Sequence, residues 1–175
     1  MNSGIVKLCV LAVSTYACLI QPLYAASSEE IVHGTIDILA PISLTNEPAD
    51  CLDFGSIAKG TSTTYVTIPP AANPTPSYSG GDATVISSSN PRAAMFTVGG
   101  EVGKAYSITL PSSSTLSFSG NSLNLSNFTC SKVTTGGAVI GLTDNNFYVG
   151  ATLEMPTTAV AGQYLGTFSV TVNYN

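Results

Sequence analysis

Hydrophobic and polar residues alternate along the last stretch of the chain. Phe168, Val170, Val172 and Tyr174 share one face of an extended segment, and Thr, Ser and Asn occupy the other face. Alternation with period two in β-branched and aromatic residues predicts a half-buried β-strand over 167–174. Chain ends fray unless they are tied down. We therefore expect this strand to pair with a neighbour, in the same chain or in another one.

Short alternating runs recur through the rest of the chain. They predict strands at 52–57, 64–68, 83–87, 95–98, 106–110, 123–128, 138–142 and 147–153. Turn residues such as Gly80-Gly81-Asp82 separate the runs, and residues 69–76, rich in proline, are predicted to form a long loop. No stretch shows sustained helical periodicity. Runs of this length and spacing predict an all-β sandwich or barrel.

A second long alternation lies near the N-terminus. Its apolar face would hold Val32, Gly34, Ile36, Ile38, Ala40, Ile42 and Leu44. Thirteen extended residues span about 43 Å, whereas a compact domain of about 150 residues is roughly 38 Å across. Proline cannot donate to a β-ladder, so Ala40-Pro41 is the natural break. We expect the part before the break to extend beyond its own domain.

The first 25 residues have the pattern of a secretory signal peptide. Lys7 precedes the apolar run 8–20, which is too short to span a bilayer, and Ala25-Ala26 is a small-residue exit. Acylation at Cys18 is an alternative, although the residues before it match a lipoprotein signal poorly. We therefore predict a leader at 1–25, an N-terminal extension at 26–40 and one domain at 41–175.

The charge of the chain argues against nucleic acid as a partner. The sequence has 5 Lys and Arg residues against 10 Asp and Glu, and a formal net charge of −5 at pH 7. Outside the predicted leader the basic residues are Lys59, Arg92, Lys104 and Lys132. Nucleic-acid binding needs clustered Lys and Arg that displace counterions, and these four are scattered. For the same reason an anionic membrane surface is disfavoured.

Two cysteines, Cys51 and Cys130, lie in the predicted exported part. An oxidising compartment favours a disulfide between a single pair. Such a bridge would close a loop of about 79 residues and stabilise the fold by roughly 4–5 kcal/mol in the chain-entropy model. Two separate buried thiols are the alternative.

The side chains that catalysis needs do not occur together in the sequence. The single histidine, His33, lies in the N-terminal segment, where no rigid surroundings would orient it. Asp50 and Asp53 flank Cys51 without a histidine for a zinc site or an activated thiol. Asp144 and the two Asn residues after it lack the glycine and glutamate of a calcium loop. We predict no enzyme, no metal and no cofactor.

The two ends together resemble a subunit of a bacterial pilus built by the chaperone–usher pathway. In that family the C-terminal strand has a penultimate tyrosine and a glycine fourteen residues from the end, the positions of Tyr174 and Gly162. The family's N-terminal extension alternates around an inward-facing glycine, and residues 32–38 are similar to it. The interior, including 52–57 and 148–153, resembles an uncharacterised group of secreted pilin-like domains. One departure is that the usual pilin disulfide is short-range.

The resemblance implies an immunoglobulin-like β-sandwich that lacks its last strand. A groove beside the C-terminal strand would be filled first by a chaperone strand and then by the N-terminal extension of the next subunit. The implied donor residues are Val32, Gly34, Ile36 and Ile38. The implied acceptor residues are Gly162, Phe168, Val170, Val172 and Tyr174.

The function implied is that of a structural subunit of a surface pilus, or fimbria, that polymerises by donor-strand exchange. Its partners would be further copies of itself or related pilins, a periplasmic chaperone and an outer-membrane usher, with a host-surface or glycan receptor as a further candidate. The protein would cross the inner membrane, pass through the periplasm and end in a fimbria on the cell surface or outside the cell.

An alternative stays open at this point. The N-terminal segment would then be an ordinary first strand that pairs with the C-terminal strand of the same chain. The product would be a closed, monomeric sandwich, such as a secreted adhesin or coat protein that binds a surface. Such a protein needs clustered aromatic and polar side chains, and the candidates Tyr65, Tyr78 and Phe118 are scattered in the sequence.

Overall fold

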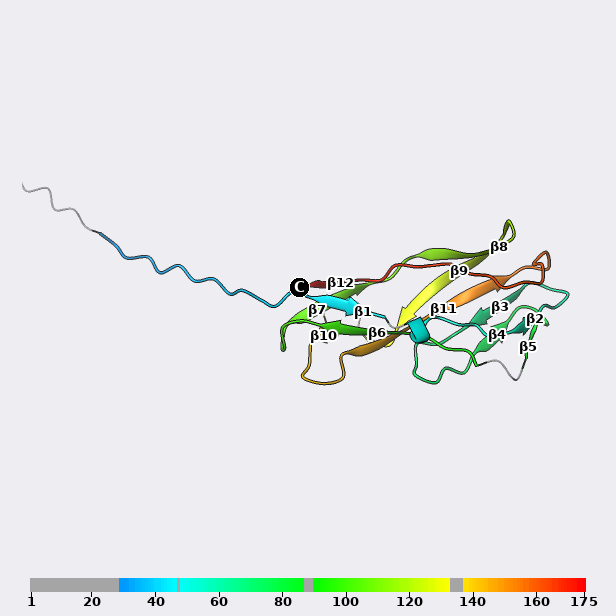
Figure 1. Cartoon of the computed structure of the whole chain (residues 1–175), viewed down its shortest axis with the longest axis horizontal. Coiled ribbons are helices and arrows are strands. Elements are labelled where there is room, and N and C mark those ends of the chain that lie inside the picture. The colour runs from blue at the N-terminus through cyan, green and yellow to red at the C-terminus, as the bar shows by residue number, and fades with distance from the viewer. Residues whose placement is uncertain (1–28, 47, 87–89, 133–136) are drawn as a thin grey trace, which may run out of the picture. The chain divides into compact units, whose positions relative to one another are not determined.

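The computed structural model describes residues 29–46, 48–86, 90–132 and 137–175 (Figure 1). The chain divides into two compact units, Met1–Ile36 and Asp37–Asn175. The predicted leader at 1–25 and the first residues of the predicted extension lie outside the described residues. Residues 29–36 are exposed and form no helix or strand. In the described parts of the chain, no helix is long and apolar enough to span a membrane.

The unit Asp37–Asn175 confirms the predicted all-β fold, with two larger antiparallel sheets as in a β-sandwich. One sheet contains β1 (Ser43–Thr45), β3 (Thr64–Thr67), β4 (Ser77–Ser79), β6 (Ala94–Gly99), β8 (Ser113–Phe118), β9 (Asn121–Cys130) and β11 (Asn146–Met155). The other contains β10 (Ala138–Val139), β7 (Ala105–Thr109) and β12 (Thr171–Tyr174). A short pair is formed by β2 (Ile57–Ala58) and β5 (Thr84–Val85), and η1 (Pro48–Asp50) is one 3₁₀ turn.

Strand β11 organises the large sheet. One of its edges pairs with β9, and the other pairs first with β6 and then with β3. Phe147, Val149, Ala151 and Leu153 are buried on it at every second position. Burying apolar side chains is the main favourable term in folding, so this strand contributes to the hydrophobic core along most of its length.

Buried side chains fall into two clusters along the domain. The first cluster contains Phe54, Val66, Ile68, Ala83, Ala93, Leu123, Leu125, Ala151, Leu153, Met155 and Ala159. The second contains Ala94, Val98, Tyr106, Ile108, Ala138, Ile140, Phe147 and Val149. Leu52 and Phe128 pack against both clusters and connect them.

Two strands of the structure were not expected from the sequence. Strand β8 has only Leu116 and Phe118 as apolar residues, and β4 follows the proline-rich loop directly. Both lie at the margins of the large sheet, where pairing to a neighbour compensates for a weak alternating pattern. At the N-terminus, residues 29–42 form no strand, and β1 begins at Ser43, after Pro41.

Candidate functional site

A groove of about 1,060 Å³ lies in the surface of Asp37–Asn175 between two segments far apart in the sequence. One wall is residues 51–59 and the other is residues 159–166. The lining includes the apolar side chains of Leu116, Leu123, Leu153 and Met155. The last three of these belong to the first core cluster. The groove is therefore a gap above the hydrophobic core.

The wall formed by residues 51–59 has one backbone edge paired and one edge free. Asp53 N donates to Arg92 O at 2.9 Å, and Arg92 N donates to Asp53 O at 2.8 Å. Successive residues of an extended chain turn their backbone groups to opposite edges. Leu52 and Phe54 therefore turn theirs toward the edge that borders the groove. Within the described residues, neither makes a backbone hydrogen bond.

The wall formed by residues 159–166 is arranged in the same way. Ser117 N donates to Leu165 O at 2.8 Å, and Leu165 N donates to Ser117 O at 3.1 Å. The backbone groups of Tyr164 and Gly166 point to the opposite edge and make no backbone hydrogen bond to any described residue. Two strand edges with free donors and acceptors thus face each other across the groove. An extended peptide binds such edges by adding a strand.

Two glycines let the second wall lie close to β8. A side chain at Gly162 would collide with the ring of Phe118, and one at Gly166 would collide with the carbonyl group of Thr115. Tyr164 also packs on Phe118, with the ring centroids 5.7 Å apart. The packing requirement at Gly162 therefore lies within the domain.

Gly162 is the predicted acceptor residue that lines the groove. The other four, Phe168, Val170, Val172 and Tyr174, are half-buried and pack against the second core cluster of their own domain. The residues between them are exposed, so the expected alternation is present. The ladder of β12 to β7 spans only Thr171–Tyr174. The part of the C-terminal segment that borders the groove is residues 159–166, which precede Phe168.

The predicted donor residues are exposed. Val32, Ile36 and Ile38 have 85%, 86% and 83% of their surface open. A side chain built at Gly34 would meet nothing within 4 Å. Burying three large apolar side chains is favourable, so this segment, which we call the arm (residues 29–38), is suited to insertion into an apolar groove.

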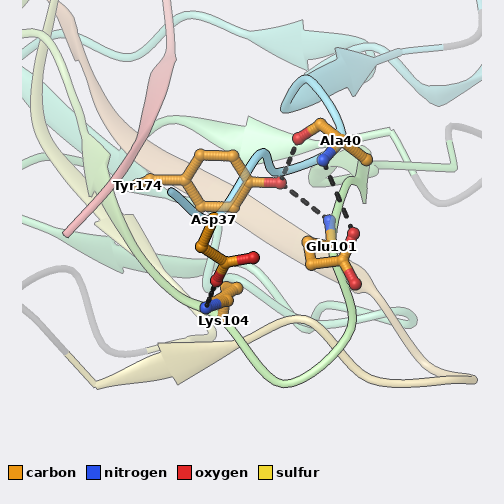
Figure 2. A network of polar contacts seen from close by, with 5 residues as sticks. All are labelled: Asp37, Ala40, Glu101, Lys104 and Tyr174. Atoms are coloured by element: carbon orange, nitrogen blue, oxygen red, sulfur yellow. Dashed lines mark hydrogen bonds and ion pairs between the residues drawn. The ribbon is translucent and has the colours of Figure 1, made fainter. Parts of the chain in front are cut away.

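The last residues of the arm and those that follow it are fixed to the domain by a small polar network (Figure 2). The Tyr174 hydroxyl donates to Ala40 O at 2.8 Å and accepts from Glu101 N at 2.7 Å. Ala40 N donates to Glu101 Oε2 at 3.5 Å, and Lys104 Nζ lies 3.1 Å from Asp37 Oδ2. The penultimate tyrosine thus ties the root of the arm to the end of the C-terminal strand. The sequence indicated that this tyrosine belongs to the C-terminal strand, but not which residues its hydroxyl group contacts.

Both cysteines are free thiols in the structure, so the predicted disulfide is not formed there. Cys51 is exposed at the wall of the groove. Cys130 ends β9 and packs half-buried against the second core cluster, where burial raises the pKa of its thiol. The two side chains therefore have different surroundings.

Two aspartates among the candidate chemical groups of the sequence have structural partners. Asp53 pairs with Arg92 at 3.6 Å and accepts from Gly55 N. Asp144 adopts a positive φ of 61° in the predicted turn, and its carbonyl group accepts from Lys132 Nζ. His33 is exposed in the arm. In the described parts of the chain, no three His, Cys, Asp or Glu side chains are grouped to hold a metal ion.

Residues 42–174 match the model of a protein family described as a domain of unknown function, DUF4402. The match covers most of the chain, so the protein belongs to this family. Searches of the curated proteins and of the solved structures found no match.

Proposed function

We propose that the protein is a structural subunit of a surface fibre of the pilus type, and that it polymerises by donor-strand exchange. The observation that carries the proposal is the open groove, which is apolar at its floor and has a free strand edge on each side. Exposed strand edges over a hydrophobic core are an aggregation hazard unless another strand covers them. The missing strand is the simplest occupant.

The arm has the properties that this occupant needs. Burial of Val32, Ile36 and Ile38 at roughly 1.5–3 kcal/mol each contributes about 5–9 kcal/mol before the cost of ordering the chain. That is comparable with the whole stability of a small domain. A subunit without a donor is therefore expected to be only marginally stable.

The hydrogen bonds that Ala40 makes with Tyr174 and Glu101, which we call the anchor, lie only a few residues from the arm. This short connection favours donation of the arm to a second molecule. Ala40 is bonded to Tyr174, and Ile38 and Ile36 lie at most about 7 and 14 Å of chain from Ala40. Gly166, at the near end of the groove, precedes Tyr174 by about 26 Å of extended strand. Even with the length of the tyrosine side chain added, Ile36 and Ile38 fall short of their own groove.

On this proposal the protein is exported, and a periplasmic chaperone covers the groove until an outer-membrane usher passes the subunit to the growing fibre. The chaperone strand and the arm would occupy the same groove in turn. Both bind through backbone hydrogen bonds and apolar side chains at alternate positions, which is strand addition to a sheet edge.

The alternative, a closed sandwich that binds a surface, has less support. Tyr65 faces Ser79 across the β3–β4 ladder, whereas Tyr78 faces Val66, so the two tyrosines lie on opposite faces. Phe118 packs on Tyr164. These aromatic residues therefore form no single binding cluster.

The test is to express the chain with its own leader, with and without residues 26–38, and to add a peptide of residues 29–40. We expect the shortened chain to be less stable and to bind the peptide. At a hundredfold excess of peptide over its Kd, the free energy of unfolding rises by about 2.7 kcal/mol. Thermal unfolding and fluorescence titration measure both effects.

Two peptide variants serve as matched controls. Ile36→Asp places a charge on the apolar face and should abolish binding, whereas His33→Ser lies on the other face of the strand and should leave binding unchanged. If the shortened chain is as stable as the full chain and ignores the peptide, donor-strand exchange is wrong.

A further inference from the structure

The anchor leaves almost no free chain between the arm and its domain. Ala40 is held by Tyr174 and Glu101, and Leu39 is half-buried. Ile38, which is 83% exposed, follows directly on the N-terminal side. One residue spans at most about 3.6 Å. If Ile38 occupies the groove of another molecule, the surface around the anchor must therefore lie against that molecule.

This surface carries exposed apolar side chains, which we call the pole patch (Val102, Val139 and Leu142). Leu142 is 87% exposed, and Val102 and Val139 are about half exposed. Backbone bonds hold their segments together, because Gly103 N donates to Ile140 O and Ile140 N donates to Lys104 O. Val102 directly follows Glu101, which bonds to the root of the arm. Strands β7 and β10 mark this end of the domain in Figure 1.

The two ends of the groove differ. Toward Tyr174, Ile42 and Leu44 pack with Phe168, Val170 and Val172 on the second core cluster and close the gap. At the other end, Lys59 Nζ donates to Ala159 O at 3.0 Å and to Thr157 O at 3.4 Å, and so joins the two walls beside the turn at 156–161, where Val160 is 43% exposed. An arm that lies along the groove with Ile38 at this end places Ile38 near Val160, and the pole patch of the donor then lies on this turn.

We propose that the pole patch docks on the turn at 156–161 of a second copy of this chain, so that arm and patch form one rigid joint. The inference rests on the proposed donor-strand exchange and adds a second contact to it. The two surfaces differ and lie at opposite ends of the groove-bearing domain. Such a head-to-tail contact generates an open fibre instead of a closed ring or pair.

The test compares an intact donor chain with its free arm. A fluorescently labelled donor at low concentration is titrated with a full-length acceptor chain that carries Val32→Asp and Ile36→Asp and so cannot donate. We expect the donor to bind at least tenfold more tightly than the peptide of residues 29–40, because the apolar side chains of the pole patch are buried in addition. The donor variant Val102→Ser/Leu142→Ser should lose this gain.

Two further variants sharpen the outcome. Insertion of Gly-Ser-Gly after Ile38 should remove the gain as well, since the patch is then no longer held against the acceptor. Tyr78→Ser, an exposed site on β4, should leave the Kd unchanged. If the peptide binds but the patch variants bind as tightly as the unaltered donor, the pole patch is no interface and donor-strand exchange still stands. If neither donor nor peptide binds, the proposed function fails and the joint fails with it.

Discussion

The N-terminal and C-terminal segments of Asp37–Asn175 border the same edge of the sandwich, yet they meet differently at its two ends. At the anchored end, Phe168, Val170 and Val172 fill the space up to Ile42 and Leu44, and all five pack on the second core cluster. At the other end, residues 159–166 and 51–59 leave a groove of about 1,060 Å³ over the first cluster.

The difference follows from side-chain volume. Two alanines, Ala159 and Ala161, line the groove, whereas Phe, Val and Tyr alternate at the anchored end. Protein interiors are close-packed, so small side chains at these two positions leave a space that another strand can fill. One segment thus completes the core at one end and leaves it incomplete at the other.

The largest expected effect contrasts the two core clusters. Ile140→Ala at the closed end should cost about 3–5 kcal/mol, because a fully packed side chain leaves a cavity. Leu123→Ala in the floor of the groove should cost about 2–3 kcal/mol, since part of its surroundings is already missing. With the arm peptide bound, the two costs should converge. Urea unfolding with and without peptide measures this, and a Leu123→Ala cost that ignores the peptide would contradict it.

A smaller effect is expected when the anchor of the closed end is removed. Tyr174→Phe deletes the hydroxyl that bonds Ala40 O and Glu101 N. We expect a loss of about 1–3 kcal/mol in the free energy of unfolding, because the Glu101 amide loses its acceptor. Tyr78→Phe, on exposed β4, is the matched control and should change stability by less than about 0.5 kcal/mol. Equal effects of the two variants would show that the anchor contributes nothing.

The closed end also contains a group whose removal should stabilise the protein. Tyr106 is fully buried, and its hydroxyl has no hydrogen-bond partner among the described residues. Burial accordingly raises the pKa of Tyr106. Tyr106→Phe should raise the free energy of unfolding by about 1 kcal/mol, because an unsatisfied polar group is removed. Tyr164→Phe, whose hydroxyl bonds the backbone of Val160, should instead lower it. A loss of stability in Tyr106→Phe would contradict the expectation.

The smallest effect concerns pH and a loop beside the open end. Hydrogen bonds from the Thr61 hydroxyl and the Ser62 amide lower the pKa of Asp82 below its ordinary value of 3.8. The stability that these bonds contribute is present above the ordinary pKa and is lost as pH falls through the lower, folded-state value. The difference in Tm between the unaltered chain and Asp82→Asn should therefore shrink as the pH is lowered from 5 to 3. A constant difference would oppose this assignment.

The strands that the sequence predicted well are those in which apolar side chains alternate along the strand and pack into the core. Residues 123–128 and 147–153 fall inside β9 and β11, the long central strands. Strand β8 was missed because its stability comes from pairing with β9 and with Leu165, and its own residues are mostly serine and threonine. Of the five residues predicted to form an acceptor strand, Gly162 lines the groove, and the donor role of the arm stays a prediction. The position of the groove was not predicted, because the gap depends on how segments about a hundred residues apart pack.

By itself, the sequence determined the all-β class and the alternation from Phe168 to Tyr174, and it predicts an alternating arm that ends before Pro41. These features are local, because they follow from the period of the chain and from the backbone limits of proline. Only the tertiary structure decided that Tyr174 holds Ala40, that Gly162 lies on Phe118 and that the groove opens between 51–59 and 159–166. Each of these depends on volumes and hydrogen bonds contributed by distant segments, which no periodicity along the chain records.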